Sequence, residues 1–318
     1  IKQSDAFNRE NRVPYLKVIV LMSLFTFVFL GAEFLFVNMI SRIVSGHRSV
    51  AAQNYALGVS AVGFVLYPLL CRFCKGNAQT SVSVCAAVIS NACLFLMCRS
   101  GSYTLTLITG LLLFLILGVF GSAVFYKSLC LLEDNTHIAR LTGISYMLGT
   151  MLQIANSNLV HIDIAEAAIL SVFIMLLALM LIRAEKNSVV PALSKSEPDG
   201  GNGRESLKIS VILVFFVALM TCIFSTLDNA VTLIHASGEA NIGQWPRVLL
   251  ALSGLLAGFL FDTASRKYMS IVMYCITVLS TTCLVILQFA GSFTAGLVIF
   301  YLAAGFFAVF FTVSFMEI

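Results

Sequence analysis

The chain has 318 residues, of which 59% are hydrophobic and only 11% charged, and its formal net charge is +4. A soluble domain carries roughly 25% charged residues, so this composition predicts a chain that is embedded in a lipid bilayer. The small positive charge is then a topology signal, and we expect no nucleic-acid partner. A membrane-crossing helix uses about 20 residues, which leaves room for roughly ten crossings.

Apolar segments bounded by charged or turn residues predict ten transmembrane helices, and therefore an all-α polytopic membrane protein. We expect them at 15–41, 50–71, 78–98, 103–130, 138–160, 164–183, 208–235, 244–262, 267–289 and 293–315. The polar stretch after the sixth helix is rich in Pro, Gly, Ser and charge, which is typical of a linker. The predicted parts are a six-helix half at 1–183, a cytoplasmic linker at 184–207 and a second half at 208–318.

Lysine and arginine predict the orientation of these helices. If the N-terminus is cytoplasmic, the outer side holds four of the 19 basic residues, namely Arg42, Arg48, Arg99 and Arg247. Since positive residues concentrate in cytoplasmic loops, we expect this orientation, in an inner or plasma membrane. The linker and the end of the eighth helix are then cytoplasmic as well.

The nine cysteines lie mostly inside apolar runs, where they behave as small buried hydrophobes. Cys71 and Cys74 form a C-x-x-C pair, but no second pair accompanies it and the chain has four His. We therefore expect no disulfide framework, no metal site and no cofactor.

Two acids interrupt the apolar helices. Glu33 lies just beyond the centre of the first helix and Asp228 occupies a similar place in the seventh. An acid at this depth costs several kcal/mol unless it faces a cavity or a partner. With Asn38 and Asn229 nearby, the two acids are candidates for binding a cationic solute or carrying a coupling proton. The alternative is that each acid is neutral, hydrogen-bonded and structural.

The two halves echo each other. Glu33 and Asp228 are 195 residues apart, and the stretches "YPLLCRFCKG" and "GFLFDTASRK" align Cys71 with Asp262 at a separation of 191. Two landmarks with nearly the same offset predict an internal duplication, as in many secondary transporters.

The second of these stretches resembles the loop signature of the major facilitator superfamily, G-x-L-x-D-R-x-G-R-[RK]. It matches at Gly258, Leu260, Asp262, Arg266 and Lys267, with Thr263 and Ser265 where the family has Arg and Gly. The first copy keeps Leu69, Arg72 and Lys75 but has Tyr67, Cys71 and Cys74 at the Gly, Asp and Gly positions. The resemblance implies a twelve-helix plan. Because the chain starts at Ile1 and stops after an apolar run, we expect a fragment without the last two helices.

The resemblance also implies a role for the loop, which in the family braces the two halves on the cytoplasmic side. Asp262 is then expected to meet the start of the fifth helix, near residues 138–140, where a helix N-terminus favours an acid. The predicted gate residues are Gly258, Asp262, Arg266, Lys267, Arg72 and Lys75. The alternative is that Arg266 and Lys267 serve only the membrane topology.

These features predict secondary transport of a small solute by alternating access, with proton-coupled efflux of an organic or amphipathic compound as the first expectation. No phosphate-binding loop, H-E-x-x-H or G-x-S-x-G motif suggests an enzyme. The rival hypothesis is a membrane sensor or assembly subunit that keeps a transporter scaffold. A five-plus-five carrier is a further alternative, which the linker after helix six disfavours. The oligomeric state stays open.

Overall fold

The computed structural model describes residues 12–44, 46–74, 76–132, 137–187, 229, 245–263, 271–276, 278–279, 282 and 293–316, and the regular elements in them are all helices. Eight have defined bounds: α2 (Arg12–Ile43), α3 (Gly46–Phe73), α4 (Asn77–Arg99), α5 (Tyr103–Leu131), α6 (Ile138–Leu159), α7 (Asp163–Asn187), α9 (Trp245–Thr263) and α11 (Phe293–Met316).

These eight helices confirm eight of the ten predicted segments to within a few residues. α7 ends at Asn187, four residues inside the predicted linker. The predicted seventh helix, 208–235, lies outside the described residues except for Asn229, which is helical. The predicted ninth, 267–289, is helical at 271–276, 278–279 and 282.

Six helices are long and apolar enough to cross a bilayer, which makes the chain a multi-pass membrane protein. Within the described residues they are Val13–Ile43, Gly46–Phe73, Ala78–Arg99, Tyr103–Leu131, Asp163–Ala184 and Val298–Met316. α6 and α9 are not among these six, so the predicted count of ten spans is not confirmed.

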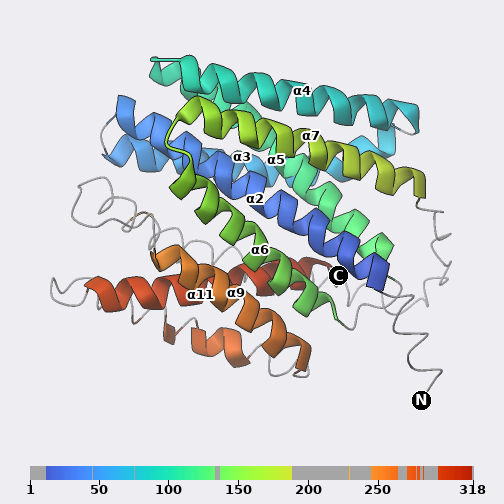
Figure 1. The fold of residues 1–318 in the computed structure, drawn as a ribbon, viewed down its shortest axis with the longest axis vertical. Coiled ribbons are helices and arrows are strands. Elements are labelled where there is room, and N and C mark those ends of the chain that lie inside the picture. Colours follow the sequence, from blue (N-terminus) through green and yellow to red (C-terminus); the bar gives the residue numbers. More distant parts are fainter. Residues whose placement is uncertain are drawn as a thin grey trace.

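The polar character of α6 follows from its place in the bundle. Its buried residues include Thr142, Ser145, Thr150, Gln153 and Asn156. Figure 1 shows α6 between α2 on one side and α9 on the other, and α11 also packs against it. A helix surrounded by other helices does not need an apolar surface on every side, because its neighbours screen its polar groups from lipid.

Contacts at the helix ends show that α5 and α7 run in the same direction and that α2 runs opposite to them. At one end of the bundle, Lys127 near the end of α5 donates to the Leu181 carbonyl near the end of α7, at 2.8 Å. At the other end, Arg42 of α2 forms two hydrogen bonds with Asp163 at the start of α7, at 2.5 and 3.0 Å. The up-and-down arrangement agrees with the predicted spans. Which end faces the cytoplasm stays a prediction.

The same kind of helix pair occurs in both parts of the chain. α3 crosses α5 so closely that a Cβ on Gly63 would lie 3.0 Å from the Gly118 Cα. α9 crosses α11 in the same way, since a Cβ on Gly305 would lie 2.8 Å from the Gly254 amide nitrogen. Gly254 follows Gly63 by 191 residues, and Gly305 follows Gly118 by 187. The first offset equals that of the loop repeat and the second differs from it by four residues, which supports an internal duplication.

A third close crossing joins the two halves. A Cβ on Gly143 of α6 would lie 2.8 Å from both the Gly254 carbonyl oxygen and the Gly258 Cα of α9. Small residues allow helix backbones to approach this closely. The G-x-x-x-G pair of α9 therefore packs at the interface between the halves, which we call the α6–α9 seam.

Replacing Gly143 with Ala is expected to destabilise the protein by roughly 1 to 3 kcal/mol, because the added methyl group meets opposing backbone that cannot rotate away. Gly58→Ala is the matched control, since a Cβ there meets nothing within 4 Å. Thermal unfolding in detergent measures both. A Gly143→Ala protein that melts no earlier than the control would contradict the close packing at the seam.

Candidate functional site

Glu33 sits at the centre of a polar cluster between the halves. The Gln53 amide of α3 donates to Glu33 Oε1 at 2.9 Å. Glu33 lies deep in the bundle and still keeps accessible surface. That combination is expected of a side chain that lines a space between helices, whereas a packed core residue has no accessible surface.

The neighbouring residue on α3 reaches the second half. Asn54 Nδ2 donates to Asn229 Oδ1 at 3.1 Å. Asn229 follows Asp228, the acid predicted to mirror Glu33, and Asp228 itself lies outside the described residues. Because Gln53 and Asn54 are adjacent, Asn229 contacts the same turn of α3 that reaches Glu33.

Arg247 provides the positive charge of the cluster. It belongs to the first turn of α9 and interacts electrostatically with Glu33 and with Glu166. Its guanidinium carbon lies 4.4 Å from the centre of the Phe34 ring, a cation–π contact that holds it against α2. The positive charge of one arginine of the second half therefore acts on two acids of the first half.

A second buried carboxyl extends the cluster along α6 and α7. Glu166 is 5% exposed and lies beside Gln153, which is 2% exposed. Among the described residues, the Gln153 amide atoms and Glu166 Oε1 have no hydrogen bond of good geometry. Buried polar atoms usually have a partner. This end of the cluster can therefore hydrogen-bond to water or to a polar solute.

The site differs in part from the sequence prediction. Glu33 and Asn229 lie in the cluster, whereas the described residues contain no hydrogen bond from the Asn38 side chain to either of them. Asn38 is half-buried, and its carbonyl accepts from the Ser41 hydroxyl at 3.0 Å.

The sequence alone does not predict Glu166, Gln53 or Arg247 as site residues. Glu166 stands in the first turn of α7, where an acid is usual because of the helix dipole. Gln53 carried one usable signal, since it adjoins Asn54 inside an apolar span. For Arg247 the sequence predicts only a basic residue on the outer side of the membrane.

A second polar contact joins the halves at the other end of the seam. The Arg140 guanidinium binds Asp262 Oδ2 at 2.6 Å, and His137 Nδ1 lies 3.3 Å from both carboxyl oxygens. The Asp262 side chain is 2% exposed, and Arg140 also lies over the Phe259 ring, 5.2 Å from its centre. Asp262 thus meets the start of α6, at the residues that the loop resemblance implied.

Two of the other predicted gate residues lie among the described residues. Gly258 packs against Gly143 in the seam, and Arg72 is exposed at the end of α3. Lys75, Arg266 and Lys267 lie outside the described residues. In the first copy of the loop, Cys71 takes the place of the acid.

Comparison with known proteins adds no identity to this chain: no family model and no curated protein matches it. The class shown is that of a helical multi-pass membrane protein.

The Arg140–Asp262 pair is expected to stabilise the fold more than the Arg42–Asp163 pair does. A double-mutant cycle with Arg140→Gln and Asp262→Asn should give a coupling of roughly 0.5 to 3 kcal/mol, because the carboxyl is buried and has no water to replace its partner. The Arg42→Gln and Asp163→Asn cycle should give about 0.2 to 1 kcal/mol, because its arginine side chain is 60% exposed. Both cycles are measured by unfolding in detergent. If the coupling between Arg140 and Asp262 does not exceed the coupling between Arg42 and Asp163, Arg140 does not hold Asp262.

Proposed function

We propose that this protein is a secondary transporter of the major facilitator type, which moves a small solute by alternating access. The observation that carries the proposal is the Glu33 cluster: a deep acid is hydrogen-bonded to Gln53 and is influenced by the charge of Arg247 of the other half. An ionisable group inside a membrane bundle is costly and is normally retained for function. Here it lies where the two halves meet.

The chemistry follows from the charges in the cluster. Arg247 favours the ionised form of the Glu33 carboxyl, and loss of that contact favours protonation. A movement that separates α9 from α2 would therefore be coupled to uptake of a proton by Glu33. A cationic solute that binds Glu33 would compete with Arg247 for the same carboxylate. An organic cation is the substrate class that agrees best with this arrangement, and proton-coupled export is the mode of transport that agrees best with it.

The Asp262 contact supplies the second requirement of alternating access. Asp262 and Arg140 join the halves at one end of the seam, and Arg247 joins them near the other. A rocking transporter must break one of these contacts while it keeps the other. On the proposed plan the Asp262 end is cytoplasmic, the N-terminus is cytoplasmic and the membrane is the plasma membrane.

Glu33→Gln is expected to lower gradient-driven flux by about tenfold or more. A charged hydrogen bond is worth about 1.5 to 3 kcal/mol, and each 1.4 kcal/mol corresponds to a factor of about ten. The assay uses the protein in lipid vesicles with an imposed pH gradient, a panel of fluorescent organic cations, and a pH dye inside to report proton movement. Asp228→Asn should have a similar effect.

Asp163→Asn is the matched control, because Asp163 is an acid of the same membrane domain whose partner is the peripheral Arg42. It should keep its flux. If the wild-type protein moves neither protons nor any compound of a broad solute panel, the transporter proposal is wrong and the sensor hypothesis gains support. If flux is present and Glu33→Gln leaves it unchanged, transport stands and the role of Glu33 does not.

A further inference from the structure

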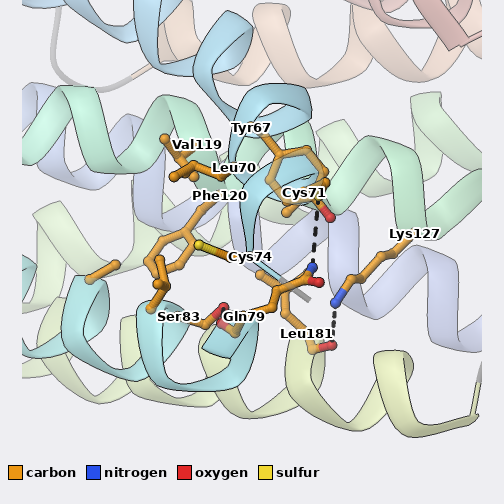
Figure 2. A pocket seen from close by; sticks show the side chains of 13 residues that line it. Tyr67, Leu70, Cys71, Cys74, Gln79, Ser83, Val119, Phe120, Lys127 and Leu181 are labelled. Carbon is orange, nitrogen blue, oxygen red and sulfur yellow. Dashed lines mark hydrogen bonds between the residues drawn. The ribbon is translucent and has the colours of Figure 1, made fainter. Parts of the chain in front are cut away.

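Cys71 and Cys74, which the proposed transport mechanism does not use, lie together in a pocket at the end of α3. Figure 2 shows both side chains in this pocket, which is also lined by residues of α4, α5 and α7. Gln79 Nε2 lies 3.8 Å from Cys71 Sγ. Ser83 and Lys127 line the same pocket, so its wall offers polar groups to water-soluble molecules.

The backbone places the two cysteines at a spacing that a disulfide accepts. The Cys74 amide donates to the Leu70 carbonyl at 2.7 Å, so the helical hydrogen-bond pattern of α3 continues to Cys74. Residues three apart on an α-helix have Cα atoms about 5 Å apart and side chains on one face. Disulfides span Cα distances of about 4.4 to 6.8 Å. A bond can therefore form without a rearrangement of the helix.

The chain around Cys74 can absorb the small adjustment that a disulfide requires. α3 ends at Phe73, so the Cys74 side chain is not held by a following helical turn. Gly76 then adopts a positive φ of 59°, which makes the turn into α4. The last turn of α3 thus sets the distance between the two cysteines, and the Cys71 thiol leaves its contact with Gln79 Nε2 when it turns toward Cys74.

The other described cysteines are less suited to such chemistry. Cys93 is buried in the core, and Cys85 and Cys275 are exposed within helical segments without a second cysteine three or four residues away. Cys130 is a possible competitor, because it and Cys71 both interact with Tyr126. The described residues contain no group of three or more His, Cys, Asp or Glu placed to hold a metal ion.

We propose that Cys71 and Cys74 form a redox-reactive dithiol that exchanges with low-molecular-weight disulfides such as oxidised glutathione. One thiol attacks the glutathione disulfide to form a mixed disulfide and releases one reduced glutathione. The second thiol then attacks the mixed disulfide, closes the Cys71–Cys74 bond and releases the other. Two electrons pass from the protein to the oxidant, and each released thiol keeps one of the two protons. The bond ties the end of α3 to the loop that repeats the Asp262 loop.

The test uses the full chain in detergent, equilibrated with glutathione buffers of increasing oxidised fraction. The sample is quenched with acid, its free thiols are labelled with a maleimide, and intact mass spectrometry counts the labels. In the wild type the labels on Cys71 and Cys74 should be lost together, and neither of these two residues should carry a glutathione. Peptide mapping should join Cys71 to Cys74.

Cys71→Ser and Cys74→Ser should each abolish the two-label loss and instead retain a glutathione on the remaining thiol. Cys85→Ser, the matched control, should keep the two-label loss, and size-exclusion elution verifies the fold of every variant. A wild type that keeps the labels on Cys71 and Cys74 in fully oxidised buffer, or a mapped bond from Cys71 to Cys130, would overturn the proposal.

Discussion

The close crossing of α6 and α9 is the contact on which the rest of the structure depends. Gly143 on one helix and Gly254 and Gly258 on the other bring two backbones together without side chains between them. Because α6 packs against α2, α9 and α11, the faces that it turns toward them can carry polar residues in an otherwise apolar bundle. The seam thus fixes both where the halves meet and where polar groups are tolerated.

Charged groups of the seam lie toward its two ends. Arg140 and Asp262 form an ion pair between α6 and α9 at one end, and Arg247 of α9 acts electrostatically on Glu33 and Glu166 toward the other. Small residues allow the two backbones to pack closely along the seam, whereas a charge pair is made or broken as a unit. A seam built in this way can have two stable arrangements, which is the property that an alternating-access mechanism requires.

The sequence predicted the helices well and the contacts between them less well. Long apolar runs determine where helices form, so the predicted bounds of α2 to α7, α9 and α11 lie within a few residues of the observed ones. The place of Asp262 was predicted through its loop motif. Hydropathy, however, does not indicate which helix lies between the two halves. The structure shows that α6 has this place, because it packs against α2, α9 and α11.

The site was predictable to the extent that an unusual residue type revealed it. Glu33 stands out as an acid within an apolar helix. Glu166 and Arg247 lie at helix starts, where charged residues are ordinary, and their proximity joins segments about 80 residues apart. A single C-x-x-C does not indicate whether both thiols share a pocket, as Cys71 and Cys74 do in the structure.

The most direct test of alternating access at the seam is a pair of distances between spin labels, introduced as unnatural amino acids so that the native cysteines stay intact. One pair joins Phe73 of α3 to Ile271, and the other joins Leu159 of α6 to Leu252 of α9; all four side chains are exposed. Lowering the pH or adding a transported cation should lengthen one distance and shorten the other. Two distances that stay unchanged, or that change in the same direction, would contradict a seam that opens at alternate ends.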